Sequence, residues 1–379
     1  MSLFISRSLT SIEIKAPVKA ATILPPILRR LSTISPYIKE IRVQIKDMHH
    51  DLSMVEASSQ LLMHCNINGL RKYNVDAAIS SSALRHAIQL PSLDSFWLIS
   101  DSSINQLTFP LPDVVFPSLR VLSVKHNDGD HTWLDLLPAI ESPVFSRISV
   151  HCPGPDVVPF MEKFELTVTG CGLHERLESF KLLSRDYVKI TTPDIIAHTF
   201  RFKKLTELHL LGTCSEFCLT SDLTDDDIDL LTKALPCLES LKLGGKPCRF
   251  PSMITFKGLS TISRRCTRLK TLQIHFSTTS LIRAVRNQAL AQVRDVRVAL
   301  GLNGIPSSEL CLITTIDVGS SRWNYGEPQN PASTMLALGL LGIFPHLENI
   351  VSKGPFSWEI VDEVIKASQS LFRVLQHNK

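Results

Sequence analysis

The sequence of 379 residues lacks a strong excess of charge of either sign. It has 40 basic and 36 acidic residues, a net charge of +4 with histidine neutral. Proteins that bind nucleic acids or anionic membranes usually carry a larger and more clustered positive charge. The composition therefore favours neither kind of partner.

The sequence also lacks a long apolar run. The longest uncharged apolar stretch runs from Met335 to Phe344 and ends at Pro345. A transmembrane helix needs about 20 such residues, roughly twice this length, so we expect no membrane span. The first residues contain no sustained apolar segment of the kind that forms a secretory signal. We expect a cytoplasmic or nuclear protein.

Motifs that carry chemistry are missing as well. The nine cysteines include no CxxC pair, and the thirteen histidines show no metal-ligand spacing such as HExxH. There is no GxSxG, no GxxxxGK[ST] and no GxGxxG after a strand. We therefore predict no catalytic residue, no metal and no cofactor, and a protein that is not an enzyme. An enzyme with a site built from loops such as 151–175 and 320–332 is the alternative from another class.

What the sequence does contain is a repeated LxxLxL spacing of apolar residues, as in Leu238, Leu241 and Leu243. Twelve copies begin at Leu9, Ile38, Leu70, Leu93, Leu119, Phe145, Leu177, Leu205, Leu238, Leu269, Ile313 and Leu347. Val293 begins a candidate extra copy. The alternation of apolar and polar residues within each copy predicts a strand.

Prolines mark half of these copies at one fixed offset. They lie two residues before the first apolar position, at Pro36, Pro91, Pro117, Pro143, Pro236 and Pro345. With 22 prolines in the chain, chance would place about one there. Because proline cannot continue a helix and favours an extended residue before it, each one indicates that a helix ends and a strand follows.

Stretches before the prolines, such as 224–235 and 331–344, have helical spacing. Units of strand, turn and helix with this motif are typical of leucine-rich repeats, here of the long, helix-containing kind. We predict an α/β fold, a leucine-rich-repeat solenoid or horseshoe with a parallel concave sheet and a helical convex side. Residues 1–379 would form a single domain of about twelve irregular units, closed by a C-terminal capping helix at 357–379.

From about residue 200 onward the sequence resembles a known family. The strings "LTDDDIDLLTKALPCLESLKLGG", "GLSTISRRCTRLKTLQIHF" and "GIFPHLENI" are similar to the leucine-rich-repeat region of F-box proteins of mushroom-forming fungi. The resemblance implies a substrate adaptor, in which an F-box binds a cullin-type ubiquitin ligase and the repeats hold the protein to be ubiquitinated. Cullin-ligase components would then be partners.

The F-box itself is not visible, because the repeat pattern already begins at Leu9. Residues 23–34, "ILPPILRRLSTI", are similar to the opening of an F-box, but they fit better as the helical return of the first unit. We expect either a partner or lost upstream sequence to cover the first strand. A structural or truncated fragment without a ligase role is a further alternative.

The predicted strands also indicate a binding surface. In each copy the residues beside the last two apolar positions point away from the core and line the concave face. The candidate partner-binding residues are Trp97, Lys125, Arg147, His151, Lys181, Glu207, His209, Lys242, Gln273 and His275. With histidine neutral they carry a net charge of +3, which favours an acidic protein partner. Trp97 stands out, because solvent-facing tryptophan is typical of binding hot spots.

Overall fold

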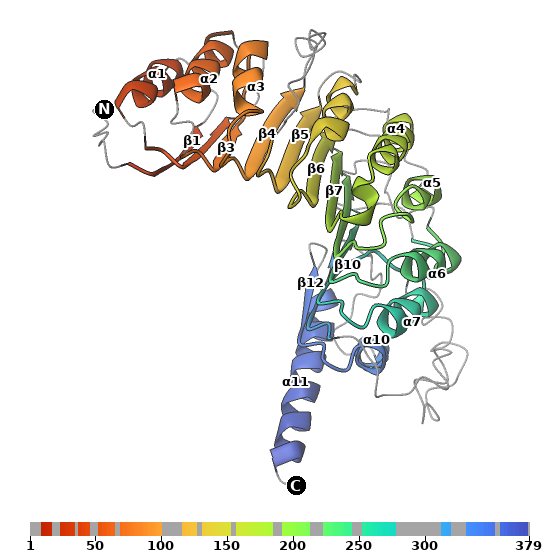
Figure 1. Cartoon of the computed structure of the whole chain (residues 1–379). Helices are drawn as coiled ribbons and strands as arrows, with labels where there is room; N and C mark the ends of the chain where they lie inside the picture. Colours follow the sequence, from red (N-terminus) through yellow and green to blue (C-terminus); the bar gives the residue numbers. More distant parts are fainter. Residues whose placement is uncertain are drawn as a thin grey trace. The chain divides into compact units, whose positions relative to one another are not determined.

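The computed structural model describes residues 9–16, 23–34, 37–45, 52–64, 69–100, 116–126, 131–152, 157–184, 192–212, 223–244, 252–277, 312–319, 331–352 and 357–377. The chain divides into two compact units, Met1–Leu182 (unit 1) and Leu183–Lys379 (unit 2). In each unit strands alternate with helices along the chain (Figure 1).

Unit 1 contains the first strands, which pair in parallel and in chain order from β1 to β6. The strands are β1 (Ser11–Ala16), β2 (Glu40–Ile45), β3 (Lys72–Val75), β4 (Ser95–Ser100), β5 (Val121–His126), β6 (Arg147–Cys152) and β7 (Ser179–Ser184), the last reaching the boundary with unit 2. The helices are α1 (Leu24–Ile34), α2 (Leu52–His64), α3 (Ser81–Ala87) and α4 (Val157–Gly170), with short 3-10 turns at Thr132–Ala139 and Leu173–Glu175.

Unit 2 repeats the same arrangement, with parallel strands in chain order from β8 to β12. Its strands are β8 (Glu207–Gly212), β9 (Ser240–Leu243), β10 (Thr271–Gln273), β11 (Thr315–Gly319) and β12 (Asn349–Ser352). Its helices are α5 (Thr192–Ala197), α6 (Asp225–Ala234), α7 (Phe256–Arg265), α10 (Pro331–Ile343) and α11 (Ser357–His377). No helix among the described residues of either unit has both the length and the apolar character to cross a membrane.

The strands lie where the repeat predicts them. Each of the twelve begins two residues after the first apolar position of a copy, so Leu238 precedes β9, which starts at Ser240. Leu208, Leu241 and Leu272 are register partners on neighbouring strands of unit 2. The predicted α/β leucine-rich-repeat fold is thus confirmed, and 23–34 is a helical return, since α1 links the paired strands β1 and β2. The candidate copy at Val293 lies outside the described residues.

The prolines occupy one position of a β-turn that precedes the strand. In the turn Leu90–Leu93 the Leu93 N–H donates to the Leu90 carbonyl at 3.4 Å, and Pro91 is the second residue. The turns at Phe116–Leu119, Ser142–Phe145 and Phe344–Leu347 are closed by the same hydrogen bond. Proline suits this position because its fixed φ matches the turn. Pro36 lies outside the described residues.

The core forms between the strands and the helices. The apolar positions of β8 and β9, such as Leu208 and Leu241, are fully buried. In unit 1 the Tyr73 hydroxyl of β3 donates to the Ser58 carbonyl of α2 at 3.1 Å, and Phe164 of α4 stacks on Phe180 of β7. The alternating residues of the strands therefore point to the other side of the sheet. We call that side the helix-free face.

The last helix packs against the last strand. The Asp362 carboxylate of α11 accepts the Ile350 N–H of β12 at 2.8 Å. Gln369 Nε2 donates to the carbonyls of Pro345 and Leu347, at 2.7 and 3.2 Å. Side chains of α11 thus form hydrogen bonds with backbone groups of β12 and of the turn before it. In an earlier unit the next repeat supplies such a contact, since Ser118 Oγ donates to the Pro91 carbonyl.

Candidate functional site

The register of unit 1 fixes which side chains are neighbours on the helix-free face. One row crosses β4, β5 and β6 at Trp97, Ser123 and Ser149. The next row toward the strand ends contains Ile99, Lys125 and His151. Because neighbouring strands lie about 4.8 Å apart, side chains of one row can contact each other directly.

Trp97 and His151 meet across the intervening strand β5. Their ring centroids are 4.8 Å apart with an interplanar angle of 68°, an edge-on arrangement. The small Ser123 lies in the same row as Trp97 on β5. The Trp97 side chain is half-buried, and its Nε1–H is enclosed with no hydrogen-bond partner within the described part of the chain. Ring carbon atoms are therefore the part of Trp97 that solvent reaches.

Lys125 does not face solvent, so the prediction that it contacts a partner is wrong. It is only 6% exposed, and its ammonium lies 4.0 Å from the Asp76 carboxylate. A lysine removed from water needs a countercharge, which explains the pairing. Counting from Leu70 by the repeat places Asp76 at the position that Lys125 has in its own copy, so the sequence did contain this signal.

Arg147 and Lys181 supply positive charge at the same face. Arg147 begins β6 and is exposed, and no carboxylate pairs with it among the described residues. Lys181 lies on the following strand, β7, and is half-buried. Trp97, His151, Arg147 and Lys181 lie on β4, β6 and β7, and the short Ser149, between Arg147 and His151 along β6, shares a register row with Trp97. We call these four residues the tryptophan cluster.

Unit 2 presents the other predicted residues, and they differ in character. Glu207, His209, Lys242 and Gln273 lie on the helix-free face of β8 to β10 and are half-buried. His209 Nε2 lies 2.8 Å from Ser240 Oγ in a hydrogen bond. His275 is 4% exposed, so its predicted contact with a partner is wrong. The strand ends at Gln273, and the chain then turns inward, where Phe276 packs on Phe256 and Trp358.

Carboxylates lie beside several of the basic residues on the helix-free face. Several cations in unit 1 already have a carboxylate beside them: Lys15 and Arg42 at Glu13, Lys72 at Glu40, and Lys125 at Asp76. The hydrogen bond and charge of Lys15, followed by Arg42, lower the pKa of Glu13. In unit 2 the strand positions of this face carry Glu207, Lys242 and Asp317. Among the described residues of unit 1, Arg147 is thus an exposed cation of this face with no carboxylate beside it.

Groups suited to a metal are a separate question. Within the residues that the structure describes, no three histidine, cysteine, aspartate or glutamate side chains gather in a way that could hold an ion. Most of the loop 320–332 lies outside the described residues. The stretch 151–175 is largely α4, with Phe160 and Phe164 in the core.

No protein-family model and no curated protein match the chain. Solved structures that are similar to it include the following two. A chain of the yeast Rad7 and Elc1 complex has 13% identity and a TM-score of 0.46, over 87% of this chain and 73% of that one. The leucine-rich repeat-containing protein LegL7 from Legionella pneumophila has 10% identity and a TM-score of 0.40, over 93% and 98%.

We therefore assign the fold class from the repeat in the chain itself, and not from these two structures. The copies, their register and their helical returns define a leucine-rich-repeat protein.

Proposed function

We propose that this protein is a non-enzymatic binding module that holds a protein partner on the helix-free face of unit 1, centred on the tryptophan cluster. The observation that carries the proposal is the edge-on pair of Trp97 and His151 beside the exposed Arg147. Tryptophan and arginine are among the residue types enriched at binding hot spots. The short serines around it permit close approach of a second backbone.

The chemistry of the cluster indicates what the partner presents. Ring carbons of Trp97 favour an apolar side chain, and Arg147 with Lys181 favours a carboxylate a few residues away. The bound segment would thus combine an apolar anchor with acidic residues. Lys125 is the register partner of His151, is held by its pairing with Asp76 and does not contact the partner.

The finer form of the proposal is a role like that of the substrate-recognition part of an F-box/leucine-rich-repeat ubiquitin-ligase adaptor. It rests on the resemblance of the sequence from about residue 200 onward. Under this role the captured protein is a ubiquitination substrate, and cullin-ligase components co-purify with the full-length protein from cells.

The test is affinity capture from the native cell followed by binding of the purified components. The bait is the intact chain, compared with Arg147→Glu, Trp97→Ala and the control Lys163→Glu on the exposed side of α4. We expect one set of proteins to be retained by the control and lost with both face variants. Arg147 is exposed, so its variant reports on binding even if Trp97→Ala unfolds. Identical capture by all four baits would refute the proposal.

A further inference from the structure

Unit 2 carries a second charged surface on three successive helix-to-strand connections, residues 201–206, 232–239 and 264–270. They contain eight basic side chains and one acidic side chain, Glu239: the basic ones are Arg201, Lys203, Lys204, Lys233, Arg264, Arg265, Arg268 and Lys270. We call these eight residues the basic rim. The whole chain has a net charge of only +4, so the rest of the chain is net acidic.

A hydrogen bond and two ion pairs join the three connections into one surface. Lys203 Nζ donates to the Ala234 carbonyl at 3.3 Å, which links the first connection to the second. Arg268 and Lys270 both bind Glu239, at 2.8 and 2.7 Å, which links the second to the third. Lys204 and Arg264 are exposed, and neither forms an ion pair within the described residues.

The repeat itself does not require this charge. From six residues before to one residue after the first apolar position, the sequences ahead of β4, β5 and β6 (87–94, 113–120 and 139–146) contain four charged residues, of which only Arg120 is basic: Asp94, Asp113, Arg120 and Glu141. Basic residues in the last turns of α6 and α7 favourably oppose the helix dipole. That explains Lys233, Arg264 and Arg265, but not Lys204, Arg268 or Lys270, which lie beyond the helix ends.

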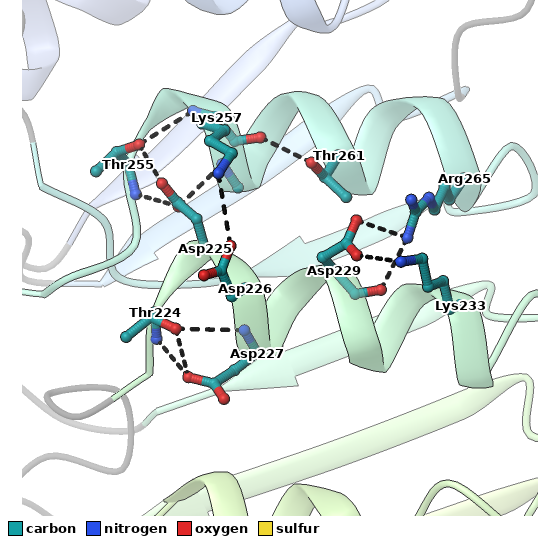
Figure 2. Close-up of polar contacts among 11 residues, drawn as sticks. Thr224, Asp225, Asp226, Asp227, Asp229, Lys233, Thr255, Lys257, Thr261 and Arg265 are labelled. Carbon is teal, nitrogen blue, oxygen red and sulfur yellow. Dashed lines mark hydrogen bonds and ion pairs between the residues drawn. The ribbon is translucent and has the colours of Figure 1, made fainter.

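The rim already binds carboxylates. Glu239 lies between Arg268 and Lys270. Asp229 of α6 lies between Lys233 and Arg265, at 2.6 Å from the first and 2.7 Å from the second (Figure 2). Both carboxylates are ligands from the chain itself, and more cations than carboxylates are present. The spacing of the cations thus fits glutamate and aspartate side chains, and the remaining cations can bind carboxylates of another molecule.

We infer that the basic rim is a docking site for an acidic segment of a partner protein, separate from the tryptophan cluster and independent of the function proposed above. A single-stranded nucleic acid is disfavoured because its binding uses exposed aromatic rings for base stacking. The only aromatic residue in the three connections is Phe202, which is fully buried. Attraction by exposed charges is long-range and salt-sensitive, so the rim would speed capture of an acidic partner.

The experiment measures fluorescence anisotropy of labelled oligoglutamate with the intact chain at low and at physiological salt. We expect oligoglutamate to bind, added salt to weaken this binding, and oligoglutamine not to bind. Lys204→Glu with Arg264→Glu weakens oligoglutamate binding by about tenfold, because two attractions become repulsions. The control Arg71→Glu with Lys163→Glu changes the net charge equally on unit 1 and changes affinity by less than about twofold.

Three outcomes would overturn the inference. The first is equal weakening by the rim and control variants, which would mean that net charge alone drives binding. The second is tighter binding of oligodeoxythymidylate or of phosphatidylserine vesicles than of oligoglutamate. The third is loss of oligoglutamate binding with Arg147→Glu but not with the rim variant, which would assign the acidic segment to the helix-free face. Unchanged thermal unfolding of each variant establishes that the fold is intact.

Discussion

The Asp225 carboxylate of α6 accepts the Gly258 N–H of α7 at 2.9 Å, so one repeat caps the helix of the next. The same carboxylate accepts the Thr255 N–H at 2.8 Å and the Thr255 hydroxyl at 2.6 Å (Figure 2). The first turn of a helix has backbone N–H groups without intrahelical partners, and Asp225 satisfies them from outside. Polar contacts of this kind join neighbouring units in addition to the apolar core.

Gly258 is needed because no side chain fits between the two helices at this point. A Cβ there would lie 2.5 Å from Asp225 Oδ1 and 2.9 Å from Ile254 Cγ2. We expect Gly258→Ala to lower the free energy of unfolding by about 1–3 kcal/mol, measured by urea denaturation. Gly170→Ala is the control, because a Cβ there meets no atom within 4 Å. Equal effects of the two substitutions would contradict the proposed role of Gly258.

Asp225 and Asp226 are adjacent but make unequal contributions to stability. Asp225→Ala removes three hydrogen bonds and should cost about 2 kcal/mol of unfolding free energy. Asp226 is 87% exposed and lies 3.5 Å from Lys257, so Asp226→Ala should change stability by less than about 0.5 kcal/mol. Urea denaturation of both variants checks the difference, and similar losses would show that charge at the start of α6, not capping of α7, is what matters.

Lys125 should behave as a core residue of unit 1. Lys125→Glu places a second carboxylate beside Asp76 in a buried position, and we expect a loss of about 3 kcal/mol in unfolding free energy. Exchange of both charges, with Asp76→Lys added, should restore part of that loss. Arg147→Glu on the exposed start of β6 should change stability by less than about 0.5 kcal/mol. Unfolding of the Lys125→Glu and Arg147→Glu variants at the same urea concentration would contradict the assignment of Lys125 as a buried core residue.

The carboxylates held by the basic rim make stability depend on pH. The hydrogen bond from Lys233 and the charge of Arg265 lower the pKa of Asp229 below 3.8, and Lys270 with Arg268 lowers the pKa of Glu239 below 4.5. Because the folded pKa lies below the unfolded value, the stabilisation is complete above the unfolded pKa and is lost as pH falls through the folded pKa.

In urea denaturation below pH 4.5, the native chain should therefore lose stability more steeply than the variant with Asp229→Asn and Glu239→Gln. High salt should reduce the difference, because both carboxylates are close to solvent. Parallel curves for the two proteins at low salt would show that these ion pairs do not contribute.

Much of the fold was readable in the spacing of apolar residues. Leu208, Leu241 and Leu272 were assigned to neighbouring strands from sequence alone, and they are register partners. The copy that begins at Leu205 has no proline, yet the Leu205 N–H donates to the Phe202 carbonyl at 3.0 Å in the same kind of turn, so proline favours this turn but is not necessary for it. Period-2 alternation with a fixed offset is a local property, and local properties survive in a single sequence.

The site was less predictable. Alternation placed Lys125 and His275 on the helix-free face, but both are buried. Lys125 pairs with the carboxylate of Asp76, the residue that follows β3, and His275 lies beyond the early end of β10. Whether a side chain that leaves the core meets water depends on its neighbours on other strands. Alternation within one copy does not contain that information, although alignment of the copies brings Asp76 and Lys125 to the same position.

The amino-acid sequence determined the number and position of the described strands, their parallel order and the helical returns, because each unit must bury the same apolar positions against its neighbours. Tertiary structure alone decided that Asp225 caps the helix of the next repeat and that Arg268 and Lys270 pair with Glu239 of the preceding connection. The physical reason is that the buried apolar positions recur at fixed offsets along the sequence. Charge pairing instead depends on which residues the stacked units bring within a few ångströms of each other.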